Sequence, residues 1–179
     1  RFTSGLNVSP IRGINDFPLN ARQLAGGLRP ERQRGATVST FFYVLDESSR
    51  ILFVDDDPIL REFAQVNLAS PSTDVDVAAD GRQALEMLLA QPYDLVLLDL
   101  EMPVLDGFAT LDQIRAHPAL SDTAVIVQTG REDVEAIDRC FRLGATSFVM
   151  KPLNWRLLAY QIRYVLRAER QVKAGVIAA

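Results

Sequence analysis

From residue 51 onward, short apolar runs alternate with longer stretches of helical periodicity along the chain. The apolar runs, which we expect to form strands, span residues 51–54, 74–79, 94–99, 123–128 and 146–150. The helical patterns span about residues 58–70, 81–90, 107–117, 131–143 and 153–171. Strands of this length and apolar character are typical of a parallel sheet covered on both faces. The alternation therefore predicts a three-layer, doubly wound α/β domain with right-handed crossovers.

Capping residues mark the ends of the predicted helices. Asp57-Pro58 places an acidic N-cap before a proline in the first turn, which is a favoured order at a helix start. Asp80-Gly81 and Asp106-Gly107 open the next two helices, and Gly144 closes the fourth. The residues expected to face inward on the fourth and fifth helices are Val134, Ile137, Phe141, Leu158, Ile162, Val165 and Leu166. On a neighbouring face of the fifth helix we expect Leu157, Tyr160 and Tyr164.

Composition narrows the classes of protein to which this chain can belong. The net charge of -4 argues against a general nucleic-acid binder. No apolar run approaches the roughly 20 residues that a helix needs to span a bilayer, and no secretory signal is visible. Cys140 is the only cysteine and His117 the only histidine, so disulfide frameworks and zinc sites have little support. We therefore expect a cytoplasmic protein with neither nucleic acid nor membrane as a direct partner.

The charge distribution changes near residue 50. Residues 1–50 hold seven arginines against four acidic residues, whereas residues 51–179 hold twelve basic and nineteen acidic residues. We expect an N-terminal extension with little regular structure at residues 1–49, the α/β domain at residues 50–171 and a tail at residues 172–179. The β-branched and aromatic segment 37–45 could add a strand or pack on a neighbour. Alternatively, it is an apolar patch within a tail or a leader.

Polar side chains stand where four of the predicted strands end. Asp55-Asp56 follows the first strand, Asp99 ends the third, Thr129 follows the fourth and Lys151 follows the fifth. Because the carboxyl ends of parallel strands meet at one edge of a sheet, we expect these groups to converge there. Each group alone is more often a cap or a turn residue, and their joint occurrence on different strands indicates a site.

The cluster of carboxylates implies a divalent cation. Carboxylates within a few ångströms of one another repel, which raises at least one pKa unless a cation is present. Ligand sets made of oxygen atoms suit Mg²⁺. We expect Asp56, Asp99 and the backbone carbonyl of Glu101 as direct ligands, with Asp55 acting through water.

The same residues suit phosphorylation of a carboxylate. This reaction needs a nucleophilic carboxylate, a metal on the phosphoryl oxygens and a further cation. Asp99 is the expected nucleophile, and Lys151 is the further cation. The chain has seventeen arginines and only two lysines, so a lysine here indicates a specific role and not a generic positive charge. Thr129 can hydrogen bond a phosphoryl oxygen, and Phe148 could swing inward when Thr129 moves.

These motifs resemble the receiver domain of two-component response regulators, over about residues 50–170. The matching positions are Asp55-Asp56, Asp99, Met102-Pro103, Asp106-Gly107, Thr129, Gly144-Ala145, Phe148 and Lys151-Pro152. The resemblance implies a flavodoxin-like, five-stranded parallel sheet in the order 2-1-3-4-5, with a cis bond before Pro152. It also implies Mg²⁺-dependent phosphoryl transfer to Asp99 from a histidine kinase or a phosphotransfer protein.

Signalling would follow from the new charge on Asp99. Thr129 and Lys151 would be drawn toward the phosphoryl group, and the face formed by the fourth helix, the fifth strand and the fifth helix would change shape. The expected consequence is dimerisation, or control of a partner or of an output module outside this chain. Glu101 and Arg131 flank the site and should tune the lifetime of the phosphate.

Two other functions compete with this hypothesis. The chain could be a receiver-shaped interaction domain that works without phosphorylation, although its full set of acids, threonine and lysine argues against that. It could also be a Mg²⁺-dependent phosphatase with a transient aspartyl-phosphate. Such enzymes usually carry a second Asp two residues after the nucleophile, where this chain has Glu101. We therefore expect no enzyme activity beyond phosphotransfer and autodephosphorylation.

Overall fold

The computed structural model describes residues 45, 48–130 and 134–175. The chain divides between Thr40 and Phe41 into two units, and every described residue belongs to the second unit. Four predictions fall wholly or partly outside the described residues: the irregular extension at 1–44 and 46–47 with its possible strand, the start of the fourth helix at 131–133, Arg131 and the tail at 176–179. The domain boundaries at residues 49–50 and 171–172 stay predictions.

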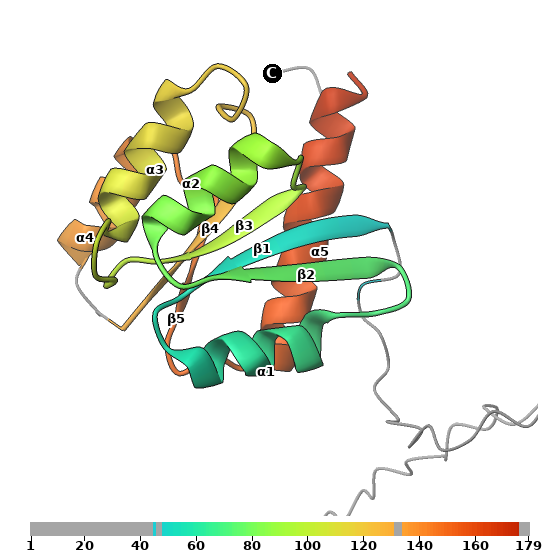
Figure 1. The fold of residues 1–179 in the computed structure, drawn as a ribbon. Coiled ribbons are helices and arrows are strands. Elements are labelled where there is room, and N and C mark those ends of the chain that lie inside the picture. The colour runs from blue at the N-terminus through green and yellow to red at the C-terminus, as the bar shows by residue number, and fades with distance from the viewer. Residues whose placement is uncertain (1–44, 46–47, 131–133, 176–179) are drawn as a thin grey trace, which may run out of the picture. The chain divides into compact units, whose positions relative to one another are not determined.

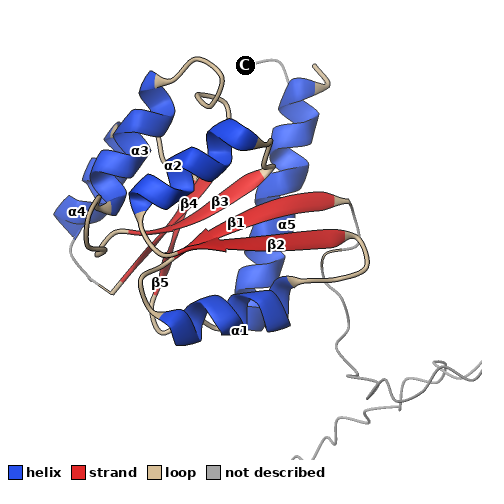
Figure 2. Cartoon of the chain, in the orientation of Figure 1, coloured by secondary structure: helices blue, strands red, loops and turns tan. Residues whose placement is uncertain are grey.

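Strands and helices alternate along the described chain, as Figures 1 and 2 show. The strands are β1 (Ser49–Val54), β2 (Thr73–Ala78), β3 (Leu95–Asp99), β4 (Ala124–Thr129) and β5 (Ser147–Met150). The helices are α1 (Pro58–Leu68), α2 (Gly81–Ala90), α3 (Gly107–Ala116), α4 (Val134–Arg142) and α5 (Trp155–Lys173). All strand pairs are parallel, and the five strands lie in the order β2-β1-β3-β4-β5. The predicted fold class and strand order are confirmed.

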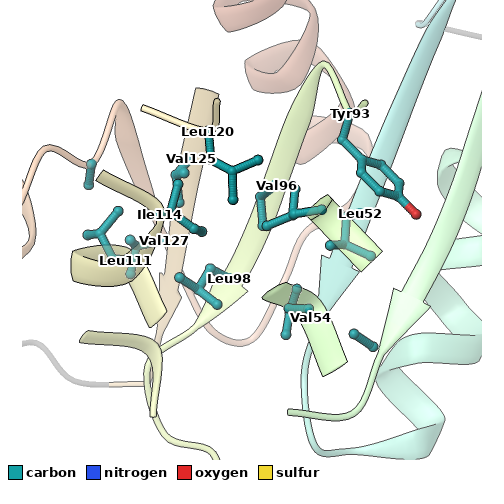
Figure 3. Packing of buried hydrophobic residues seen from close by; sticks show 14 of the residues in the cluster. Leu52, Val54, Tyr93, Val96, Leu98, Leu111, Ile114, Leu120, Val125 and Val127 are labelled. Atoms are coloured by element: carbon teal, nitrogen blue, oxygen red, sulfur yellow. The ribbon is translucent and has the colours of Figure 1, made fainter. Parts of the chain in front are cut away.

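The middle of each central strand, residues 51–54 of β1, 95–98 of β3 and 124–127 of β4, is apolar because both faces of these strands are buried. Successive side chains alternate between the two faces, so each strand contributes to two separate cores. One core holds Leu52, Val54, Val96, Leu98, Val125 and Val127 with residues of α2 and α3 (Figure 3). The other holds Ile51, Phe53, Leu95, Leu97, Ala124 and Ile126 with residues of α1 and α5. The helices on the two faces complete the three layers seen in Figure 1.

The helix ends follow the predicted capping pattern. The side chains of Asp57, Asp80 and Asp106 accept hydrogen bonds from the first-turn backbone of α1, α2 and α3. Gly144 follows α4 with a φ of +89°, a conformation that glycine adopts without strain. In the described part of the chain, no helix is long and apolar enough to cross a bilayer.

The expected inward face was right for α5 and wrong for α4. Leu158, Ile162, Val165 and Leu166 of α5 are all buried. On α4 the buried residues are Ala136 and Cys140, whereas Val134 is 69% exposed and Phe141 is 46% exposed. The side chains that α4 buries are small, and its bulky apolar side chains at Val134 and Phe141 lie toward solvent.

Candidate functional site

The strand register places two acidic residues side by side. Val54 of β1 pairs with Leu98 of β3, so the residues that follow them, Asp55 and Asp99, occupy equivalent positions at the carboxyl end of the sheet. Oxygen atoms of Asp55, Asp56 and Asp99 all lie within 4.8 Å of one another. Asp55 and Asp99 are buried, whereas Asp56 is exposed. The structure thus gathers three carboxylates that the sequence predicted to be close.

Lys151 joins the two buried carboxylates. Its Nζ lies 2.7 Å from Oδ2 of Asp55 and 2.8 Å from Oδ2 of Asp99. The lysine follows β5 directly, and its backbone N–H donates to the carbonyl of Thr129 at 2.9 Å. The peptide bond between Lys151 and Pro152 is cis, as the resemblance implies. One ammonium therefore serves two carboxylates in a mostly buried site.

The charges of this cluster are not fully balanced. Burial raises the pKa of Asp99, although the hydrogen bond and the charge of Lys151 oppose this shift, and the charge of Asp55 adds to it. Burial alone would lower the pKa of Lys151, but Asp55 and Asp99 together raise it. The site stabilises its ammonium and leaves Asp99 less easily ionised than an ordinary aspartate.

The turn after β1 fixes the first carboxylate. Asp55 donates its backbone N–H to Ala78 at 3.1 Å, and its Oδ1 accepts from the backbone of Asp57 at 2.9 Å. Its carbonyl accepts from Nη1 of Arg61 on α1 at 2.7 Å. Asp57 itself caps α1 by accepting from the backbone of Ile59, as predicted from the sequence. Asp55 is thus held through both its main chain and its side chain.

The loop after β3 packs its main chain tightly against the backbone of Asp99. Gly107 donates to the carbonyl of Leu100 at 3.1 Å, and a Cβ at Gly107 would lie only 2.1 Å from the carbonyl oxygen of Asp99. Oδ1 of Asp99 accepts from the backbone of Glu101 at 3.4 Å. Val104 adopts a φ of +69°, which is strained for a β-branched residue. A glycine and a strained turn therefore shape this side of the site.

The remaining predicted site residues lie around this cluster. Thr129 ends β4 and is buried, and its carbonyl accepts from Lys151. Phe148 is half-buried on β5, and its ring meets Phe141 of α4 edge to face at 6.0 Å between centroids. Glu101, two residues after Asp99, is exposed. The roles assigned to these residues stay predictions.

The donor set fits a divalent cation that prefers oxygen ligands. Three carboxylates face one ammonium, so the cluster keeps an excess of negative charge. Two of the three acids are buried, where water screens their repulsion poorly. A small cation with several oxygen ligands, such as Mg²⁺, would offset this charge while keeping waters on the exposed side near Asp56.

Sequence reasoning missed one buried polar residue beside the site. Gln128 of β4 is 0% exposed, and its Nε2 donates to the carbonyl of Val54 at 3.1 Å. The signal was present, because Gln128 is a polar residue inside a run that is otherwise apolar. The backbone carbonyl that its side chain binds lies on β1, two strands away in the sheet. No local pattern in the sequence predicts such a contact.

Comparison with known proteins gives sequence relatives along most of the described chain. The family model of the response regulator receiver domain matches residues 51–163. The transcriptional regulatory protein AruR of Pseudomonas aeruginosa is 39% identical over 133 residues, which make up 70% of this chain and 52% of that protein. A probable cyclic di-GMP phosphodiesterase of Vibrio cholerae is 37% identical over 120 residues, which make up 67% of this chain and 27% of that protein. The chain spans about half the length, or less, of these curated relatives.

Several solved structures match the described domain along nearly their full length. The chemotaxis protein CheY4 of Vibrio cholerae aligns with a TM-score of 0.63 and 28% identity, covering 66% of this chain and 98% of that chain. A putative response regulator of Chloroflexus aurantiacus aligns with a TM-score of 0.64 and 26% identity, covering 68% of this chain and 99% of that chain. The described domain therefore aligns with almost the whole length of each of these two chains.

Proposed function

The chain belongs to the response regulator receiver family of two-component systems, and on this premise we propose that it is a signalling module switched by phosphorylation of Asp99. The observation that carries the proposal is the position of Lys151, whose Nζ lies within 2.8 Å of both Asp55 and Asp99. A phosphoryl group on Asp99 would therefore form beside an ammonium and two further carboxylates. The donor is a histidine kinase or a phosphotransfer protein.

Different residues of the chain would have different roles in an in-line phosphoryl transfer. A carboxylate oxygen of Asp99 attacks phosphorus, a new O–P bond forms, and the P–N bond to the donor histidine breaks. Lys151 neutralises charge on the phosphoryl oxygens, while Arg61 and the turn at Asp57 keep Asp55 in place. The residues that would hold Mg²⁺ are Asp56, Asp99 and the Glu101 carbonyl, with Asp55 acting through water. When bound, the ion supplies further charge neutralisation at the phosphoryl oxygens.

Contacts around β5 offer a route from the site to the surface. Lys151 follows β5, Phe148 of β5 packs against Phe141 of α4, and Gln161 of α5 donates to Ser147 and to the carbonyl of Phe148. Movement of Lys151 and Thr129 toward a phosphoryl group would therefore disturb the contacts of both α4 and α5.

The face formed by α4, β5 and α5 exposes bulky apolar side chains. These are Val134, Phe141, Met150, Leu157, Tyr160 and Tyr164. Exposed apolar groups on neighbouring elements are a common mark of interaction surfaces. We assign this face to a second copy of the chain or to a partner. The relatives named as a transcriptional regulator and as a phosphodiesterase favour an output module outside this chain.

Incubation with acetyl phosphate and Mg²⁺, followed by intact mass spectrometry, tests the proposal. The expected result is one phosphoryl adduct per chain, which Asp99→Asn removes. Asp112→Asn, which changes an exposed carboxylate on α3, is the matched control and should leave the adduct unchanged. Light scattering on the same samples shows whether the adduct promotes dimerisation.

The other outcomes favour the competing functions. Continuous release of inorganic phosphate without an accumulating adduct would identify a phosphatase. A chain that acquires no adduct at saturating Mg²⁺ would be an interaction domain that works without phosphorylation.

A further inference from the structure

A wholly buried amide lies next to the phosphoacceptor. Gln128 is 0% exposed and pairs with Asp99 across the β3–β4 ladder. It is among the largest side chains of the described chain that are fully buried, and the others in that group are apolar. A buried amide must be hydrogen bonded or it lowers stability. The hydrogen-bond partners of Gln128 therefore indicate its role.

Gln128 is bonded to the residues that adjoin both buried carboxylates. Its Nε2 donates to the carbonyl of Val54 at 3.1 Å, and Val54 immediately precedes Asp55. Its own carbonyl accepts from the backbone of Leu100 at 3.2 Å, and Leu100 immediately follows Asp99. One residue thus bonds to the main chain beside each acid.

The side-chain bond reaches over a strand. β1 and β4 are not neighbours, because β3 lies between them in the sheet. The bond from Gln128 to Val54 therefore links the carboxyl ends of three strands in addition to their ladders. Strand ends are where ladder hydrogen bonds stop and where repulsion between Asp55 and Asp99 would spread β1 and β3 apart.

Packing alone does not explain this residue. Oε1 of Gln128 is buried and has no hydrogen-bond donor among the described residues. A buried acceptor without a donor lowers stability, and a leucine of similar size would fill the same space without that cost. Only the NH₂ group of this amide is paired, through its bond to Val54, so filling space in the core does not account for a glutamine at this position.

We propose that Gln128 is a positioning residue of the phosphorylation site, which holds Asp55 and Asp99 at the separation that lets them bind one cation together. The proposal rests on the function proposed above and extends it to a residue that need not touch the phosphoryl group. In its absence, the two carboxylates would relax apart and would share a cation less well.

Calorimetric titration of the metal-free protein with Mg²⁺ tests this role for Gln128→Leu. The expected result is about tenfold weaker Mg²⁺ binding, which corresponds to about 1.4 kcal/mol. The rate of phosphorylation by acetyl phosphate should fall at low Mg²⁺ and return toward the wild-type rate at saturating Mg²⁺. Gln128→Met, which keeps the length of the side chain, provides a second variant if the leucine variant does not fold.

Gln91→Leu is the matched control, because Gln91, the C-cap residue of α2, makes side-chain hydrogen bonds to Arg50 of β1 and Asp76 of β2 away from the carboxyl end of the sheet. It should lower the melting temperature and leave Mg²⁺ affinity unchanged. Wild-type Mg²⁺ affinity in a folded Gln128 variant would overturn the proposal, as would equal losses of affinity in the variants of both glutamines. If wild-type protein binds Mg²⁺ but is never phosphorylated, the proposed function fails while the affinity comparison still decides the role of Gln128.

Discussion

The two ends of the sheet carry polar networks of opposite character. At the amino end, Oδ2 of Asp76 accepts from the Tyr93 hydroxyl at 2.9 Å and from Gln91 Nε2 at 3.1 Å, and Oε1 of Gln91 accepts from Arg50 at 2.5 Å. Donors and acceptors there satisfy one another. At the carboxyl end, the buried acids Asp55 and Asp99 share a single ammonium.

This difference separates a network that supports the fold from one that is suited to binding. Where every donor and acceptor of a network is paired within the protein, the hydrogen bonds stabilise the folded chain without any ligand. Buried carboxylates that face too little positive charge lower its stability until a cation or a phosphoryl transfer changes their environment. Functional sites are commonly maintained at such a cost in stability.

The largest expected effect concerns the close backbone approach at the carboxyl end. Gly107→Ala should lower the free energy of unfolding by roughly 3 kcal/mol, because the added methyl group would meet the main chain of Asp99 and Leu100. Urea denaturation followed by circular dichroism measures the loss. Adduct formation with acetyl phosphate should fall as well, since the backbone carrying Asp99 must shift.

Gly130→Ala is the control for this substitution, because no atom of the described residues lies within 4 Å of a Cβ placed at Gly130. It should change stability by no more than about 0.5 kcal/mol. If the two alanine variants lose equal amounts of stability, the cause is the loss of backbone freedom at glycine and not the contact with Asp99.

Neutralising one carboxylate at each end of the sheet should change the stability of the protein in opposite directions. Asp99→Asn should stabilise the metal-free protein by about 1–2 kcal/mol, because it removes a desolvated carboxylate while Lys151 keeps Asp55 as a partner. Asp76→Asn should destabilise it by about 1 kcal/mol, because the bonds from Tyr93 and Gln91 lose their charged acceptor. Thermal unfolding without Mg²⁺ at neutral pH measures both. Destabilisation by both variants would remove the contrast between the ends of the sheet.

The last expected effect concerns the titration of Tyr93 at the amino end of the sheet. Burial raises the pKa of its phenol and the carboxylate of Asp76 adds to the shift, whereas Gln91 and Arg50 oppose it. The folded chain thus keeps this proton at pH values where the unfolded chain has lost it. Stability from this group is complete below the ordinary tyrosine pKa of about 10 and is lost as pH rises through the higher folded pKa.

Tyr93→Phe should therefore lower the free energy of unfolding by about 1 kcal/mol at neutral pH, through loss of the bond to Asp76. The gap between variant and wild type should narrow above pH 10. Denaturation curves taken from pH 7 to 11 measure the gap, and groups common to both proteins cancel in the difference. A gap that stays constant with pH would show that Tyr93 does not titrate differently in the two states.

The sequence by itself determined the fold class and the order of its elements. Strand and helix periods are local properties, and caps such as Asp57 and Asp106 act within one turn, so both can be inferred without knowing distant neighbours. Polar residues that interrupt apolar runs also indicated which residues gather at one edge, because parallel strands all end on the same side.

Only the tertiary structure decided which of those residues meet and which are buried. The bridging position of Lys151, the link from Gln128 to Val54, and the choice of Ala136 over Phe141 as an inward residue all depend on segments far apart in the sequence. Burial and hydrogen bonding are set by the neighbours that packing supplies, and a local pattern of apolar and polar residues does not specify those neighbours.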